Sequence, residues 1–212
     1  MAGDTEARVH GILSELQSLD KVRELFAEIN YDPAHDLLSR GSWSKATADA
    51  LAEDPQIIAT SGEFQVIYAR LAKDSLLLGD ERPVVNRLLQ DHEYMLCLFS
   101  DKQQKQWHFV NVKYDTERSK RRLFRRITVS PDERLRTACE RLSRIDAEGL
   151  NPDNPLDIQY KHDEAFDVEA VTEEFFKTYD KVFKSVENLI EGFGNAERKR
   201  LFTQRLFNRL MF

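Results

Sequence analysis

The sequence contains few cysteines and no metal-ligand pattern. Its two cysteines, Cys97 and Cys139, fall in segments whose patterns indicate a buried strand and the apolar face of a helix. A cysteine in such a place behaves as a small hydrophobic residue, so we expect no disulfide. The five histidines are scattered, and no C-x-x-C or His-x-x-x-His pair is present. We therefore predict that this chain binds no metal and no cofactor.

Long apolar runs are also absent. No stretch reaches the roughly 18 uninterrupted apolar residues that a membrane span requires. The first residues show neither the basic region nor the apolar segment of a signal peptide. Charged residues make up 32% of the chain, which indicates a heavily solvated surface. We expect a cytoplasmic protein with no membrane partner.

Length and composition allow a substantial core. With 212 residues, of which 41% are hydrophobic, the chain can form one large domain or one domain with a helical extension. Between residues 146 and 162, glycine, proline, asparagine and acidic residues are concentrated, a composition typical of a loop. We place a domain boundary there, with an N-terminal α/β domain at 1–150 and a linker with a two-helix extension at 151–212.

Hydrophobic spacing predicts helices and strands in the first domain. Helical spacing predicts helices at 5–30, with a break near Asp20, and at 44–53, and a loop joins the two segments. A further helix opens at 80–83. Runs of β-branched and aromatic residues predict strands at 57–59, 64–68, 94–99, 107–114 and 123–129. We predict an α/β (α+β) fold, with a mixed, mostly antiparallel sheet, flanking helices and a C-terminal helical hairpin.

One helix start has a specific local signal. Ser130 can cap a helix whose first residue is Pro131, and Glu133 stands where it can return the capping bond. We predict that a helix begins at 131. Its apolar positions are expected to face the core, namely Leu135, Ala138, Leu142 and Ile145.

The charge is distributed unevenly. Between Arg118 and Arg144 there are ten basic and three acidic residues, a net +7, which leaves −13 for the rest because the chain totals −6. A basic segment on an acidic chain is typical of contact with a phosphate-rich partner. The predicted DNA contacts are Lys120, Arg121, Arg122, Arg125, Arg126, Arg134, Arg141 and Arg144. The alternative is that these residues pair with acidic groups of this chain or of another domain. No groove-reading helix pattern predicts base recognition.

A nuclease site is a weaker hypothesis. Such a site holds a divalent metal between an acid on one strand and an Asp/Glu-x-Lys motif on the next. The candidate strand reads Asn111-Val112-Lys113, where asparagine replaces the required acid. Glu63 and Asp101 are the remaining carboxylate candidates beside Lys113. The alternative is an ordinary core strand, in which His108 is a structural histidine and not a general base.

The last helix has more apolar surface than it can bury alone. Residues 168–189 predict a long helix that ends before Gly192 and Gly194, and residues 198–212 predict a second helix that doubles back. The second helix carries an apolar stripe made of Phe202, Leu206, Phe207, Leu210, Met211 and Phe212. We expect this stripe to pack against a further domain, as in a portion of a larger protein.

The same segment carries a resemblance. Arg205–Phe212 reads RLFNRLMF and is similar to the LLNRLMF helix that precedes the methyltransferase domain in large type IIG-like restriction–modification and phage-defence proteins. The similarity covers about residues 163–212 and includes VEAVTEEFFKTY at 168–179. Trp107–Lys113 and Arg134–Ala138 resemble the amino-terminal region of one branch more loosely.

The resemblance implies the N-terminal region of an adenine-specific DNA methyltransferase, serving DNA contact or interdomain assembly. Its partners would be DNA and the methyltransferase domain, whose cofactor is S-adenosylmethionine. The family's Gly-rich turn for that cofactor and its Asn-Pro-Pro-Tyr/Phe loop are absent from all 212 residues. We therefore expect no methyl transfer by this chain alone. The alternatives are a metal-dependent restriction nuclease domain and a protein-interaction module.

Overall fold

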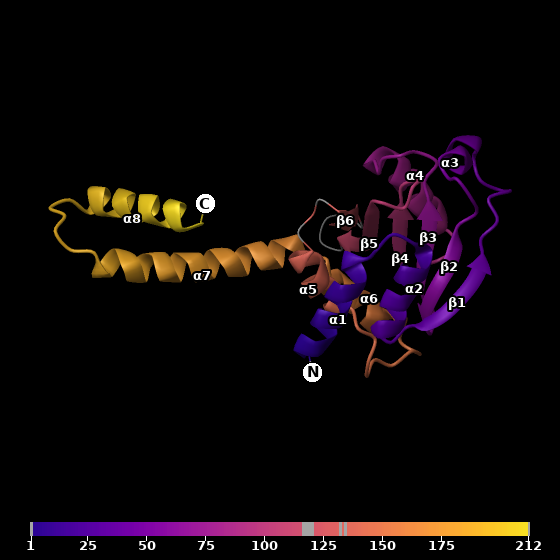
Figure 1. Ribbon diagram of the computed structural model, residues 1–212, viewed down its shortest axis with the longest axis horizontal. Helices are drawn as coiled ribbons and strands as arrows, with labels where there is room; N and C mark the ends of the chain where they lie inside the picture. The colour runs from indigo at the N-terminus through magenta and orange to yellow at the C-terminus, as the bar shows by residue number, and fades with distance from the viewer. Residues whose placement is uncertain (1, 116–120, 132, 134, 212) are drawn as a thin grey trace. The chain divides into compact units, whose positions relative to one another are not determined.

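Six strands form one mixed sheet in the order β1-β2-β3-β4-β5-β6 (Figure 1). This computed structural model describes residues 2–115, 121–131, 133 and 135–211. The strands are β1 (Asp32–Leu37), β2 (Gln56–Ser61), β3 (Phe64–Arg70), β4 (Met95–Ser100), β5 (Trp107–Asp115) and β6 (Arg121–Val129). The helices of the same unit are α1 (Ala2–Ser14), α2 (Leu19–Glu28), α3 (Lys45–Asp49), α4 (Leu78–Leu88), α5 (Arg136–Arg144) and α6 (Pro155–Ala165).

The topology confirms the predicted α/β class. Among the strands that the structure describes, only β3 and β4 pair in parallel, and α4 makes the crossover between them that parallel pairing requires. All other neighbouring strands are antiparallel. The predicted turn at Ser61-Gly62 joins β2 to β3, with Gly62 at φ +57°. A Cβ atom at Gly62 would lie 1.8 Å from the carbonyl oxygen of Pro152, so only glycine fits this approach.

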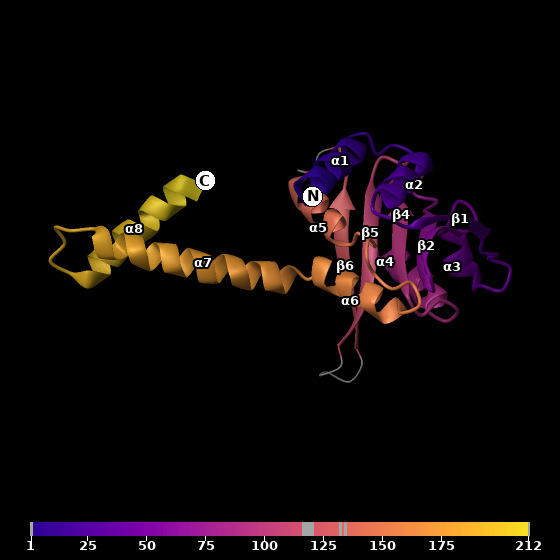
Figure 2. The same cartoon turned by 90° about the horizontal axis from the view of Figure 1, so that it is seen from below.

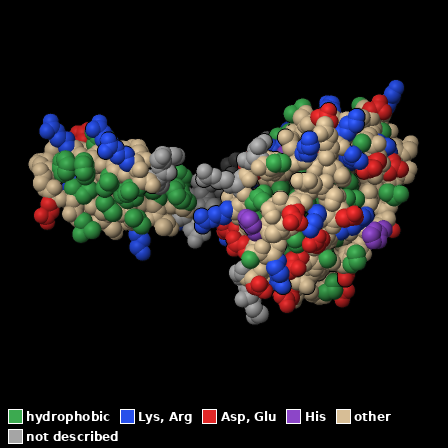
Figure 3. Space-filling model, in the orientation of Figure 1, with side chains coloured by type: hydrophobic (Ala, Val, Ile, Leu, Met, Phe, Trp, Pro, Cys, Tyr) green, Lys and Arg blue, Asp and Glu red, His purple; other side chains and the backbone are tan. Residues whose placement is uncertain are grey.

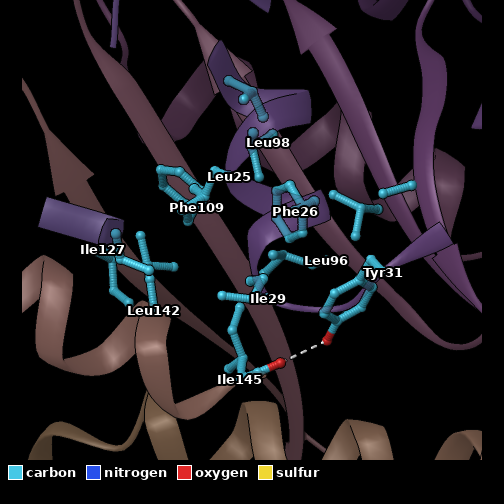
Figure 4. Close-up of a cluster of buried hydrophobic side chains, with 14 of the residues drawn as sticks. Leu25, Phe26, Ile29, Tyr31, Leu96, Leu98, Phe109, Ile127, Leu142 and Ile145 are labelled. Carbon is cyan, nitrogen blue, oxygen red and sulfur yellow. Dashed lines mark hydrogen bonds between the residues drawn. The ribbon is translucent and has the colours of Figure 1, made fainter. Parts of the chain in front are cut away.

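Two apolar layers cover the sheet. On one face, side chains of α1, α2, α5 and α6 pack on alternate residues of the strands, as Figure 4 shows for part of this cluster. On the other face, α4 packs through Val84, Val85 and Leu88. Every residue of β4 is buried because this central strand is covered on both faces. Figure 2 shows the helical layers from a second side.

The structure differs from the sequence prediction at β1 and at the start of α5. Residues 32–37 form the edge strand β1 where a loop was expected. The strand tolerates Pro33 because an edge position needs fewer ladder hydrogen bonds, and its residues are mostly exposed, so they give no apolar pattern. Helix α5 begins at Arg136 and not at 131, and the Glu133 N–H donates to the Ser130 carbonyl in a turn before it. Of its expected core residues, Ala138, Leu142 and Ile145 are buried and Leu135 is half-buried.

The chain divides into two compact units, 1–166 and 167–212. This division falls later than the expected boundary at 150, because residues 155–165, which were expected to belong mostly to a loop, form α6. Ile158 and Ala165 of α6, and Phe166 just after it, pack into the core of the first unit. Among the described residues, no helix is long and apolar enough to cross a membrane.

The second unit is the predicted helical hairpin, made of α7 (Val168–Leu189) and α8 (Ala196–Met211). Phe207 of α8 packs against Tyr179 and Phe183 of α7, with ring centroids 5.4 and 5.3 Å apart. Among the side chains described in this unit, those of residues 167 and 175–210, only Thr203 and Phe207 are buried. The pair therefore has very little core of its own.

Candidate functional site

The structure does not bring the three nuclease candidates together. Glu63 lies in the turn between β2 and β3, level with the start of β4, and the register of β5 places Lys113 near the same end. Asp101 follows the last residue of β4, at the opposite end of the sheet. At about 3.3 Å per residue, Asp101 is more than about 20 Å from Glu63 along the strands. In the described part of the chain, no group of three His, Cys, Asp or Glu residues can hold a metal ion.

Asp101 and Asn111 instead have structural partners. Asp101 Oδ1 accepts hydrogen bonds from the backbone N–H groups of Lys105 and Gln106, at 2.7 and 3.0 Å, and so fixes the β4–β5 loop. Asn111 is fully buried and donates to Asp163 Oδ1 at 2.7 Å, while its own oxygen accepts from Gln159 at 3.0 Å. An amide suits this position because it both donates and accepts, which an ionised acid cannot do.

The predicted DNA-contacting residues lie on different faces of the first unit. Arg122 and Arg126 project to the α4 face of the sheet, whereas Arg125 opposes Asn111 and projects to the other face. Arg141 and Arg144 belong to α5, which covers that other face, and Arg144 is ion-paired with Glu140. Lys120 and Arg134 lie outside the described residues, as does the side chain of Arg121. Proximity in sequence therefore did not produce one continuous surface.

A further arginine lies beside Arg122 and Arg126 and was missed from the sequence. Arg82 on α4 is exposed, and its guanidinium lies 5.6 Å from the centroid of the Phe124 ring. Arg122 donates to Asn86 of α4 at 3.2 Å. Arg82 falls outside the basic segment counted along the sequence, so only the packing of α4 on β6 reveals the cluster. Arg82, Arg122 and Arg126 are called the arginine surface below.

A buried carboxyl group lies under this surface. Glu81 is 1% exposed, and its Oε1 is hydrogen-bonded to Nδ1 of the buried His108. Arg126 Nη1 lies 4.0 Å from Glu81 Oε2 and 3.5 Å from His108 Nδ1. Within the described residues, Oε2 of Glu81 accepts no hydrogen bond. The sequence held a signal for this residue, since Glu81 stands at helical spacing from Val84, Val85 and Leu88.

His162 belongs to the core of the first unit. It is fully buried near the end of α6, and its Nε2 lies 2.8 Å from the hydroxyl of Tyr31. That hydroxyl donates to the carbonyl of Ile145 at 3.0 Å, so Nε2 of His162 carries the proton and donates to Tyr31. Burial, with a smaller effect of the Lys161 charge, lowers the pKa of the His162 imidazole to about 3.

The helical pair exposes most of its apolar side chains. Leu210 is 75% and Phe202 46% exposed, whereas Phe207 is buried between the helices and Leu206 is half-buried. The side chains of Met211 and Phe212 lie outside the described residues. The exposed apolar set, each member at least 40% exposed, consists of Phe175, Phe176, Val182, Leu189, Phe193, Leu201, Phe202 and Leu210. Figure 3 shows hydrophobic side chains gathered over one side of this unit.

An open pocket adjoins this set on α8. Phe202, Leu206, Asn208 and the basic residues Arg205 and Arg209 line it, and its volume is about 640 Å³. An apolar floor with a basic rim is suited to a folded partner with acidic groups around an apolar patch.

Comparison of the chain with protein-family models, with curated proteins and with solved structures gives no match.

Proposed function

We propose that this chain is a non-catalytic assembly region of an adenine-specific DNA methyltransferase of a restriction–modification or phage-defence system. In this role the helical pair docks the methyltransferase domain. The supporting observation is the exposed apolar set on a unit that buries only two of its described side chains. The resemblance of residues 163–212 supplies the identity of the partner.

The exposed area is large for so small a unit. Eight large apolar side chains on α7, α8 and their connection stay in water, and Leu189 and Leu210 are 81% and 75% exposed. Burying one such side chain completely contributes about 1.5–3 kcal/mol. Exposed apolar surface of this extent marks an interaction site. Basic residues outnumber acidic ones five to one along α8, so the docked surface should be acidic at its rim.

The alternative of a metal-dependent nuclease has less support. It requires Glu63, Asp101 and Lys113 in one cleft, and the sheet separates Asp101 from the other two. Methyl transfer by this chain alone also has no support, because the sequence lacks the cofactor and adenine motifs of the methyltransferase family. Assembly remains the function that the surface chemistry favours.

Calorimetric titration tests this proposal directly. The chain is titrated with the adenine-specific methyltransferase domain of the resembled class, encoded in the same genome and expressed separately. We expect a one-to-one complex with micromolar or tighter affinity. Leu210→Glu should weaken it at least about tenfold, because a charge would replace a desolvated contact.

Leu37→Glu is the matched control. Leu37 is 69% exposed at the end of β1, in the first unit, so the same change there should leave the affinity unchanged. Absence of a complex at high micromolar concentration, or equal effects of the two substitutions, would reject the proposal.

A further inference from the structure

The arginine surface presents three guanidinium groups from two elements that pack together. Arg82 and Arg122 are exposed, and the side chain of Arg126 is 34% exposed. Helix α4 lies along β6. Asn86, Arg82 and Glu81 of the helix contact Arg122, Phe124 and Arg126 of the strand, respectively. Because β6 is the last strand of the sheet, these groups stand at its edge. Strand β6 therefore sets the spacing of Arg122 and Arg126, and the packing of α4 adds Arg82.

The spacing matches a polyanion with regularly placed charges. Residues 122 and 126 are four apart on β6, so their Cα atoms are about 13 Å apart, with Arg82 placed between them. The major groove of a DNA duplex is about 12 Å wide, so phosphates on its two sides are separated by a comparable span. Planar guanidinium groups also form paired hydrogen bonds with phosphate oxygens.

Arg126 has the most specific surroundings of the three. Its Nη1 is within 4.0 Å of the buried Glu81, which is in turn hydrogen-bonded to the buried His108. A buried carboxyl group is costly and is retained where it holds a cationic or hydrogen-bonding partner in one place. Glu81 can therefore orient the guanidinium group of Arg126 from its buried side, while the outer edge of that guanidinium group faces solvent.

We propose that Arg82, Arg122 and Arg126 bind the phosphate backbone of a nucleic-acid duplex, with Glu81 as the positioning residue for Arg126. This surface belongs to the first unit and shares no residue with the helical pair. The inference therefore goes beyond the proposed function, and either can fail alone. The competing explanation is that basic residues on β6 only prevent edge-to-edge pairing of sheets.

Fluorescence anisotropy with a short labelled DNA duplex of arbitrary sequence tests the proposal. With three contacts, the logarithm of the binding constant should fall with the logarithm of salt concentration at a slope of about −2.7. Arg82→Gln and Arg126→Gln should each reduce this slope by about 0.9 and weaken binding about eightfold at about 0.1 M salt. Arg144→Gln, on α5 and ion-paired with Glu140, is the matched control and should change neither quantity.

Glu81→Gln separates positioning from overall charge. Loss of a negative charge alone would tighten binding to a polyanion, whereas loss of the support for Arg126 would weaken it. We expect weaker binding, by up to the eightfold effect of Arg126→Gln, with the melting temperature recorded for every variant. Tighter binding by Glu81→Gln would overturn the positioning role. Equal effects of Arg82→Gln and Arg144→Gln, or equally tight binding of polyglutamate, would overturn the duplex surface.

Discussion

The neutral His162 should make the stability of the first unit depend on pH. Its imidazole has a pKa of about 3 in the folded chain against 6.5 as the ordinary value. The folded pKa is the lower one, so the unfolded chain binds a proton that the folded chain does not. Stability from this residue is therefore complete above about pH 6.5 and is lost as the pH falls from there towards 3.

The size of this effect follows from the difference in pKa. A pH of about 5 lies about 1.5 units below the pKa of His162 in the unfolded chain. Protonation of His162 therefore stabilises the unfolded chain there by about 2 kcal/mol. Substitution by glutamine keeps a donor towards Tyr31 and removes the titration. Lowering the pH from about 7.5 to about 5 should reduce the free energy of unfolding of both proteins. We expect this reduction to be about 2 kcal/mol smaller in His162→Gln than in the unsubstituted chain.

Urea unfolding followed by tryptophan fluorescence measures this difference. Both tryptophans, Trp43 and Trp107, lie in the first unit, and Trp107 is fully buried, so the signal reports on that unit. A pH-independent loss of stability in His162→Gln does not affect the result, because each protein's free energy of unfolding is compared with its own value at the second pH. His10→Gln, at an exposed position of α1, should leave the dependence intact. The same pH dependence in His162→Gln and the unsubstituted chain would refute a neutral buried imidazole.

Two further substitutions test packing around the sheet. Asn111→Asp would place a second carboxylate against Asp163, now 2.7 Å from the amide nitrogen, and should lower the free energy of unfolding by about 2–4 kcal/mol near neutral pH in urea titrations. A neutral result would show that this buried network is hydrated or rearranged. Gly62→Ala should lower the melting temperature because its Cβ would overlap a backbone carbonyl at positive φ, at a cost of about 1–3 kcal/mol. Gly11→Ala, in open space on α1, should instead raise it, and equal effects would contradict the close approach.

Local patterns in the sequence determined the elements of the fold. Alternating and helical spacing located most strands and helices, and Ser61-Gly62 located the first hairpin of the sheet, because turn chemistry and burial on one face act over a few residues. The mixed sheet and the helical hairpin follow from these patterns. The edge strand β1 escaped them because its exposed residues carry no apolar alternation.

Only the tertiary structure decided which functional groups share a surface. A strand sends successive side chains to opposite faces, so Arg125 is separated from Arg122 and Arg126, while Arg82 joins them through the packing of α4 on β6. The environment of His162 likewise depends on Tyr31, which is 131 positions away in the sequence. Charge and residue type are properties of the sequence, whereas burial, hydrogen-bond partners and the spacing of charges arise from contacts between segments that are distant along the chain.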